Sequence, residues 1–473
     1  MNRALERGAR RVAVLGGGIS GVTAAWQLAQ RERAQGDVDI TLFEASARLG
    51  GIVETTLRDG FTVECGPDGW VTEKPWAREL ARELGIHTKL IPSLDADRVT
   101  YILSQGKLVA IPDGMRMMVP TDLAALDASP LFSDDAKRAY AAEPGRAAEL
   151  KASAPDFSQG QDESIAQFVE RHFGHEVLTK IAAPLLSGVF GGDVAKLSVR
   201  AVMPAFVRME REHGSLILAL QSAAASAEYE EKPTIFTSLT SGTAGFIDRM
   251  KSELPPGSVR LNAPVTALTR DASYWLVEAD GETLPFDDVI MALPAHVARQ
   301  LLAPVSPPLA ELLVMDASSA VIAAFAFTQP FELPRGFGFL VPAGEDSRLL
   351  AATFVDQKFP GRVPEGGRLL RAFFGGEPAP LIASKSDDEI AALALAELQK
   401  ILGPLPAPAF QIVRRWPNSL PQYEVGHLDR VAQIDALVRR QPNLWLLGNA
   451  YHGVGLPDLI RDARAAARQV LDR

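Results

Sequence analysis

"RRVAVLGGGISGVTAAWQLAQRE", residues 10–32, decides the fold of this chain. The apolar run 12–15 predicts a short buried strand, the glycines after it a turn, and the residues that follow a helix. Gly16, Gly18 and Gly21 have the G-x-G-x-x-G spacing of a dinucleotide-binding loop. In that loop the first glycine permits the tight turn, the second lets the backbone approach a pyrophosphate, and the third allows close packing of helix on strand.

A second predicted strand, "VDITLFEA", ends at an acidic residue. Glu44 lies a little over twenty residues past Gly21, where a carboxylate accepts a hydrogen bond from a ribose 2′-hydroxyl and repels a 2′-phosphate. The alternative is a strand–helix–strand unit that binds no nucleotide. We favour the nucleotide, because loop, helix, strand and acid follow in the expected order, and we predict a Rossmann-like α/β domain.

Composition limits what the rest of the protein can be. With 473 residues, 47% apolar and 22% charged, we expect a globular protein of two or three domains. The formal net charge of −10 argues against nucleic acid as a partner. A single cysteine, Cys65, excludes disulfides within the chain and a metal site built on several thiolates, so we expect no metal. No apolar run reaches membrane-spanning length, so we expect a cytoplasmic protein, with peripheral contact to the cytoplasmic membrane face left open.

The stretch "EASARLGG", residues 44–51, adjoins the acid of the second strand. It resembles the second dinucleotide signature of the amine-oxidase-like flavoproteins, which borders FAD in that family. Ile52 stands where the family often has a basic residue. "FTVECGPDGW", residues 61–70, predicts a strand and a Gly-Pro turn that lays backbone beside the flavin. The resemblance therefore implies FAD rather than a nicotinamide cofactor.

The middle of the chain differs from its ends in composition. We predict a discontinuous FAD-binding domain, an α+β substrate domain in two pieces, and a mainly helical insertion, with the boundaries 1–92, 216–299 and 413–473 (FAD), 93–110 and 300–412 (substrate) and 111–215 (insertion). Ser164 is predicted to cap a helix, and Asp280-Gly281 to form a hairpin turn. The methionine-rich segment around 115–132, with three methionines within 115–118, has two interpretations, a membrane-facing or substrate-entry surface and plain core, and we lean to the first.

Several stretches spread over nearly the whole chain resemble the protoporphyrinogen oxidase family of flavoproteins. They include "PLLSGVFGGDVAKLSVRAVMPAF", "SLTSGTAG", "WPNSLPQYEVGHLDR" and "GNAYHGVGLPD". The resemblance implies that FAD is bound by Gly16, Gly17, Gly18, Ile19, Ser20, Gly21, Glu44, Ala45, Arg48, Gly50, Gly51, Ile52, Gly66, Pro67, Asp68, Gly69, Val265, Trp416, Val454, Gly455 and Leu456. Because no cysteine lies near the C-terminal motif, the flavin is expected to be non-covalent. His452 is interpreted as a loop histidine that transfers no proton.

The resemblance also implies a substrate, a porphyrinogen macrocycle that carries propionates. Arg98 matches the arginine that pairs with a propionate, and its planar guanidinium suits two bonds to a carboxylate. The apolar walls and one close backbone approach are assigned to Phe337, Gly338, Leu340, Thr353, Phe373 and Gly188.

The implied activity is the oxygen-dependent oxidation of protoporphyrinogen IX to protoporphyrin IX in haem biosynthesis. Six electrons leave in three hydride transfers to FAD, with release of H₂O₂ and without a catalytic side chain. Lys107 and Arg116 are candidates for the second cation pair of the alternative, a coproporphyrinogen III oxidase. An amine oxidase, a polyene desaturase and a non-catalytic flavin or porphyrin carrier are less favoured, and a homodimer is left open. We place His172 and His175 in a surface helix without a metal.

Overall fold

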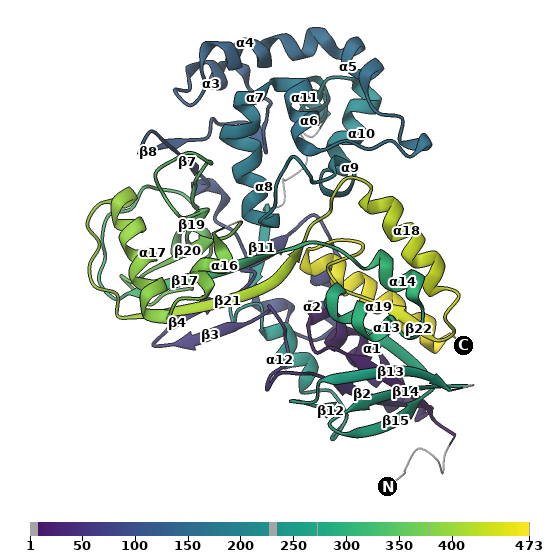
Figure 1. Cartoon of the computed structure of the whole chain (residues 1–473). Helices are drawn as coiled ribbons and strands as arrows, with labels where there is room; N and C mark the ends of the chain where they lie inside the picture. Colours follow the sequence, from purple (N-terminus) through teal and green to yellow (C-terminus); the bar gives the residue numbers. More distant parts are fainter. Residues whose placement is uncertain (1–7, 227–233, 272, 377, 473) are drawn as a thin grey trace. The chain divides into compact units, whose positions relative to one another are not determined.

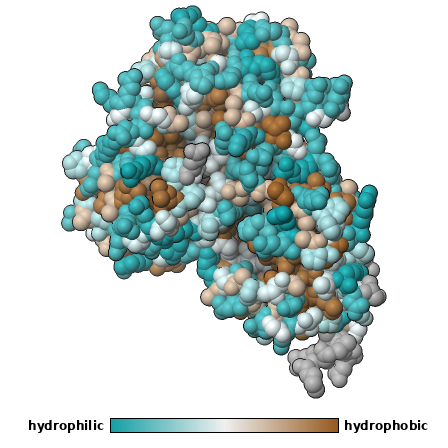
Figure 2. Space-filling model, in the orientation of Figure 1, coloured by the Kyte–Doolittle hydropathy of each residue, from teal (hydrophilic) through white to brown (hydrophobic). Residues whose placement is uncertain are grey.

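The computed structural model describes residues 8–226, 234–271, 273–376 and 378–472. The chain forms two compact units. Unit 1 comprises Met1–Ser93, Ile235–Asp316 and Arg430–Arg473, and unit 2 comprises Leu94–Thr234 and Ala317–Asp429. Both units mix helices and strands, as the sequence predicts (Figure 1). On the face drawn in Figure 2, hydrophilic residues predominate and apolar residues gather in limited patches.

A five-stranded parallel sheet forms the centre of unit 1. Its strands lie in the order β12-β2-β1-β16-β22, with the bounds Val259–Arg260, Val38–Phe43, Arg10–Leu15, Asp288–Met291 and Leu444–Leu446. Successive residues of β1 enter two different apolar cores, because side chains alternate between the faces of a strand. Val12 and Val14 belong to one core, and Ala13 and Leu15 to the other.

Helices cover one face of this sheet and a second sheet covers the other. The first core contains residues of α1 (Ile19–Gln35), α2 (Trp76–Glu83), α12 (Gly245–Lys251) and α19 (Leu456–Leu471). The second core contains residues of the antiparallel sheet β13-β14-β15 (Val265–Asp271, Tyr274–Ala279, Glu282–Phe286) and of α13 (Ala295–Leu302), α14 (Pro307–Leu312) and α18 (His427–Val438). The predicted turn joins β14 to β15, with Asp280 and Gly281 both left-handed (φ 55° and 74°).

The remaining strands of unit 1 are short. They form the hairpin β3 (Thr55–Arg58) and β4 (Phe61–Glu64) and the antiparallel set β5 (Trp70–Val71), β11 (Phe236–Leu239) and β6 (Leu90–Pro92). The last helix returns to the first fold, because the Arg10 guanidinium donates to Val470 O at 3.0 Å.

A seven-stranded sheet forms the centre of unit 2. Its order is β21-β17-β20-β19-β18-β7-β8, with the bounds Phe410–Pro421, Ala317–Phe327, Arg368–Phe374, Ala351–Phe354, Gly338–Leu340, Thr100–Ser104 and Lys107–Ala110. One face, which we call the core face, packs on α16 (Ala379–Ala383) and α17 (Asp387–Leu402). Alternation sends Phe325 and Phe374 to that face. The alternate residues of each strand point to the opposite face.

The rest of unit 2 is mainly helical. The helices are α3 (Leu123–Ala128), α4 (Asp134–Ala142), α5 (Ala147–Ser153), α6 (Ile165–Phe173), α7 (His175–Val177), α8 (Ala183–Phe190), α9 (Val199–Val202), α10 (Pro204–His213), α11 (Leu216–Ser226) and α15 (Val355–Lys358). Ser164 caps α6 in a capping box with Gln167, as predicted.

The methionine-rich stretch is a short hairpin rather than helix. It consists of β9 (Met115–Arg116) and β10 (Val119–Pro120). Met115 and Met118 are buried, which fits the core interpretation of this stretch rather than the membrane-facing one. No helix in the described ranges is long and apolar enough to cross a membrane.

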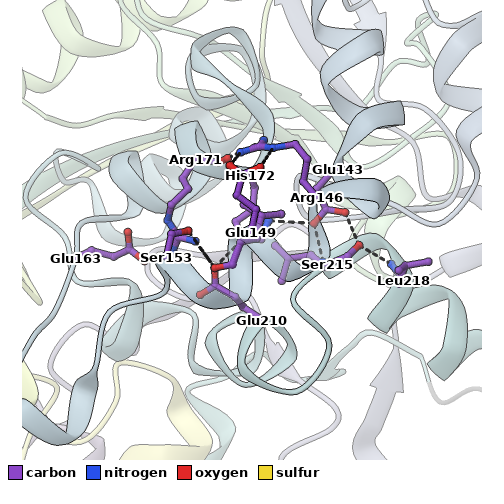
Figure 3. Close-up of polar contacts among 12 residues, drawn as sticks. Glu143, Arg146, Glu149, Ser153, Glu163, Arg171, His172, Glu210, Ser215 and Leu218 are labelled. Atoms are coloured by element: carbon purple, nitrogen blue, oxygen red, sulfur yellow. Dashed lines mark hydrogen bonds and ion pairs between the residues drawn. The ribbon is translucent and has the colours of Figure 1, made fainter.

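The prediction that His172 lies on a surface is wrong, because its side chain is fully buried between two acids (Figure 3). Its Nδ1 lies 3.0 Å from Glu143 Oε1 and its Nε2 lies 2.9 Å from Glu210 Oε1. Arg171 extends the network, because it bonds Glu210 and, at 2.5 Å, Glu163. Glu143 also accepts from the Leu216 N–H, so these charges join α6, α10 and the start of α11. His175 is exposed, as expected.

The network also sets the ionisation of its central acid. Burial alone raises the pKa of Glu210, but hydrogen bonds from His172 and Arg171 outweigh burial and hold this pKa below its ordinary value of 4.5. A depressed folded-state pKa gives stability that is present above the unfolded value and lost as the pH falls through the folded value. We therefore expect this cluster to weaken in acid, below about pH 4.5.

We predict that His172→Leu lowers the free energy of unfolding by about 3–5 kcal/mol, because it leaves two buried carboxylates without their shared partner. The measurement is urea denaturation followed by circular dichroism. His175→Leu is the matched control, since this neighbouring histidine pairs with Glu170 at an exposed site, where an ion pair contributes about 1 kcal/mol or less. Equal effects of the two substitutions would contradict a stabilising role for the buried network.

Candidate functional site

The glycine loop of unit 1 has the close contacts that its spacing predicts. Gly16 is left-handed (φ 102°), and a Cβ there would lie 2.3 Å from Ala292 O. A Cβ on Gly21 would lie 1.9 Å from Gly16 O, so only glycine lets α1 pack this closely on the end of β1. At Gly18 a Cβ would meet nothing within 4 Å. The loop therefore has open space in front of the helix.

The Glu44 side chain faces this loop, and its contact with a ribose hydroxyl stays a prediction. Its Oε2 accepts from Gly17 N at 2.7 Å, and its Oε1 accepts from Ser46 N at 2.8 Å. Each carboxylate oxygen keeps a second lone pair, with which it can accept from a ribose hydroxyl. The carboxylate thus both fixes the turn and offers acceptors to a nucleotide.

The N-terminus of α1 suits a diphosphate. Gly18 is its N-cap, no side chain caps it, and its first turn contains no acid. The first N–H groups and the positive end of the helix dipole therefore lie beside the open space at Gly18, where they favour an anion. With the Glu44 carboxylate alongside, these residues fit the ADP moiety of FAD.

The "RLGG" stretch packs directly on the glycine loop. Gly50 N donates to Gly17 O at 2.7 Å, and Gly50 forms a bridge with Gly18. Arg48 holds this stretch in place, because its guanidinium donates to Gly51 O at 2.6 Å and to Glu54 at 2.9 Å. Ala45 and Ile52 lie before and after this stretch in the sequence, and their contacts with FAD stay predictions.

The Gly-Pro turn adjoins the same surface. A Cβ on Gly66 would lie 1.8 Å from Ile52 O. Thr243 donates to Pro67 O at 3.1 Å, and Ser238 donates to Asp68 O at 2.7 Å, so the turn 66–69 is held from β11 and the loop after it.

Glu64 supports this turn and was missed from the sequence. It is completely buried and accepts from Thr243 N at 2.8 Å and Thr55 Oγ1 at 2.7 Å. The available signal was an acid at the end of the predicted strand, between the apolar Val63 and Cys65.

The C-terminal loop joins β22 to α19. Gly455 is the N-cap of α19, and Val454 and Leu456 flank it. Asp458, also missed from the sequence, is buried in the first turn, where its charge favours the helix N-terminus. It pairs with Lys74 at 2.5 Å and with Arg461 at 3.3 Å. The approach of residues 454–456 to the flavin ring stays a prediction.

Two further predicted flavin contacts lie in different units. Val265 begins β13, shortly after Ala263, whose N–H donates to Glu44 O at 2.9 Å. Val265 therefore follows closely on a segment that is hydrogen-bonded to Glu44. Trp416 lies on β21 of unit 2, paired with Ala320, and its contact with FAD stays a prediction.

Four predicted substrate residues lie on one face of the sheet of unit 2. In the strand register Gly338 pairs with Thr353, Leu340 with Ala351, and Ala351 in turn with Phe373. Their strand neighbours Phe339, Ala352, Ala372 and Phe374 belong to the core face. Gly338, Leu340, Thr353 and Phe373 therefore share the opposite face, which we call the substrate face.

The remaining predicted substrate residues are Gly188, Phe337 and Arg98. An ideal Cβ on Gly188 of α8 would lie 3.7 Å from the Leu340 side chain. Phe337 N donates at 2.8 Å to the carbonyl of Val99, the residue after Arg98. Arg98 therefore precedes a residue that is held by Phe337, and its contact with a propionate stays a prediction.

Two arginines of the substrate face were missed from the sequence. Arg371 pairs with Thr353 and Ala324, and its guanidinium lies 5.0 Å from the centre of the Phe373 ring. Arg414, which lies on β21, pairs with Ile322 of β17. Arginine within a strand of buried apolar residues was the signal for Arg371. Of the two suggested cations, Lys107 lies on the edge strand β8 and Arg116 on β9, outside this sheet.

In the described part of the chain, no cluster of three or more His, Cys, Asp or Glu residues could hold a metal ion.

Comparisons with known proteins agree with this picture. The family of flavin-containing amine oxidoreductases matches residues 19–471. The coproporphyrinogen III oxidase of Bacillus subtilis (strain 168) is 31% identical, over 99% of this chain and 99% of that protein. The chloroplastic protoporphyrinogen oxidase of Oryza sativa subsp. japonica is 30% identical, over 97% and 88%. A solved structure from Exiguobacterium sp. 255-15, assigned as a protoporphyrinogen oxidase, is 31% identical and superposes with a TM-score of 0.85 over 98% and 99%.

We predict that Glu44→Ala yields protein without FAD, because two backbone N–H groups lose their acceptor and the ribose loses its partner. The measurement is the ratio of flavin to protein absorbance after purification. Asp39→Ala is the matched control, since Asp39 lies exposed on the same strand, β2. Full flavin occupancy in Glu44→Ala would remove Glu44 from the nucleotide site.

Proposed function

Because the chain belongs to the family of flavin-containing amine oxidoreductases, we propose that it is an oxygen-dependent porphyrinogen oxidase of haem biosynthesis that holds FAD without a covalent bond. The observation that carries the proposal is the extent of the likeness. Relatives named coproporphyrinogen III oxidase and protoporphyrinogen oxidase match this chain over 97% of its length or more, which includes both units.

FAD would supply a two-electron oxidant that O₂ restores with release of H₂O₂, and three rounds would convert a porphyrinogen into a porphyrin. The residues of this chain have other tasks. In unit 1 the glycine loop and Glu44 would hold the nucleotide. In unit 2 the substrate face offers half-buried apolar side chains, Leu340 and Phe373, against which the apolar macrocycle can pack.

Arg98 would orient the macrocycle by binding a propionate. A guanidinium forms two parallel bonds with a carboxylate, so it fixes direction as well as affinity. Gly188 would let the macrocycle approach α8, because only the Leu340 side chain lies within 4 Å of the position of its missing Cβ. No side chain is assigned as a base, since the pyrrole nitrogens can stabilise the charge that develops on the substrate.

The substrate has two candidates. Our interpretation of the sequence favours protoporphyrinogen IX, with two propionates. The name of the Bacillus subtilis relative favours coproporphyrinogen III, with four. The arginines of the substrate face, Arg371 and Arg414, add positive charge beside the wall, which supports the substrate with more carboxylates.

Three finer points remain part of the proposal: O₂ as the electron acceptor, a homodimer, which the sequence leaves open, and a cytoplasmic location, with peripheral membrane contact also left open. Oxygen uptake, sedimentation and co-flotation with lipid vesicles respectively test them.

We predict that anaerobic mixing of the yellow protein with its porphyrinogen bleaches the flavin absorbance, because electrons pass to the cofactor when O₂ is absent. Porphyrin fluorescence should then develop when air is admitted. Protoporphyrinogen IX and coproporphyrinogen III are tested separately, and the one that bleaches the flavin faster is the preferred substrate. Unchanged absorbance with both would refute the proposed function.

We predict that Arg98→Ala raises KM about 10- to 150-fold, which corresponds to the loss of a charged hydrogen bond of about 1.5–3 kcal/mol. Arg98→Lys should recover part of the affinity, because the charge returns without the bidentate geometry. Arg138→Ala, at an exposed position on α4, is the control and should leave KM unchanged. A wild-type KM in Arg98→Ala would exclude Arg98 from the site.

A further inference from the structure

His452 lies in the loop 448–455 and has a carboxylate on each side of its ring. Its Nε2 lies 3.1 Å from Asp435 Oδ2 on α18, and its Nδ1 lies 4.0 Å from Asp462 Oδ2 on α19. A neutral imidazole has one N–H, whereas the imidazolium has two. Only the protonated ring can therefore direct a donor toward both carboxylates.

The main chain at the same point is held by α19. His452 O accepts from Arg461 at 3.2 Å. The next residue, Gly453, is left-handed (φ 146°), and a Cβ there would lie 2.8 Å from the Asp458 side chain. Asp458 is itself fixed by Lys74 and Arg461. The loop thus lies against the start of α19. The His452 ring gives it a polar contact with α18, in addition to the apolar core that Ala450 and Tyr451 share with residues of that helix.

The ring can exchange its proton with solvent. It borders a cavity of about 380 Å³ whose charged lining residues are Asp435, Asp462 and Arg439 besides His452 itself, and its side chain is 43% exposed. Arg461 is the remaining charged neighbour, and it works against protonation. The hydrogen bond to Asp435 raises the pKa of His452 above its ordinary value of 6.5, although partial burial opposes this rise.

We propose that His452 is a positioning residue of the flavin site, whose protonated ring ties the loop 448–455 to α18 through Asp435 and thereby strengthens the binding of FAD. The inference rests on the proposed function, because Val454, Gly455 and Leu456 are the residues of this loop that we predict to contact the flavin. It assigns His452 no proton transfer to or from the substrate.

The direction of the pH effect follows from the raised pKa. The ion pair is complete when the pH is below the ordinary histidine value and is lost as the pH rises through the raised value. Because coupling between two binding events is reciprocal, a proton that favours the loop arrangement for FAD also favours FAD itself. For a partly exposed pair we expect FAD to bind about two- to fivefold more weakly at alkaline pH.

The test uses the flavin-loaded protein, diluted at about pH 6 and at about pH 8.5, on either side of the histidine titration. The rise of free FAD fluorescence to equilibrium gives Kd. In the wild type Kd should increase about two- to fivefold between the two conditions. In His452→Gln and in Asp435→Asn it should be independent of pH and close to the wild-type alkaline value.

His296→Gln is the matched control, because His296 is exposed on α13 of the same unit, and it should keep the wild-type pH dependence. Wild-type pH dependence in both His452→Gln and Asp435→Asn would overturn the inference, as would a pH-independent Kd in the wild type. Such results with intact porphyrinogen oxidation would leave the proposed function standing. Failure of the wild type to hold FAD at either pH would defeat both.

Discussion

The absence of a side chain at Gly21 is the constraint on which unit 1 depends. With a Cβ only 1.9 Å from Gly16 O, any other residue would push α1 away from the end of β1. The close contact places the uncapped start of α1 next to Gly18 and the Glu44 carboxylate. The ends of β1 and β2 and the N-terminus of α1 together form a site that suits an anion. It also fixes the face of α1 that shares an apolar core with α19, and α19 in turn holds the C-terminal loop.

In unit 2 the alternation of side chains along each strand determines which residues enter the core and which line the substrate face. In β20 the residues Leu370, Ala372 and Phe374 enter the core under α17, while Arg371 and Phe373 point to the substrate face. One strand thus supplies both stability and a binding surface. Arg371 is almost completely buried on that face, and its guanidinium lies 5.0 Å from the centre of the Phe373 ring.

Buried carboxylates and a buried histidine connect segments that are distant in sequence. His172 joins Glu143 to Glu210, Glu64 joins β4 to the loop after β11, and Asp458 joins Lys74 to the last helix. A buried charge is costly without partners, so each of these groups has two or more. The specificity of the contacts follows from that cost, because a shifted segment would leave a carboxylate unpaired in an apolar environment.

The sequence by itself determined the features that depend on a few adjacent residues. The glycine spacing predicted the contacts of Gly16 and Gly21, Ser164 predicted its cap, and Asp280-Gly281 predicted its turn. Local sterics and hydrogen bonds set these features, so they can be derived without knowledge of the rest of the chain.

Only the tertiary structure decided which distant residues meet. The sequence contains 58 acidic residues, and nothing local to His172 identifies Glu143 and Glu210 as its partners. Likewise the methionines at 115 and 118 are buried, and Arg371 shares a face with Phe373 through strand pairing. Burial and long-range pairing depend on how elements far apart in sequence pack, and a periodic pattern encodes which face is apolar but not what covers it.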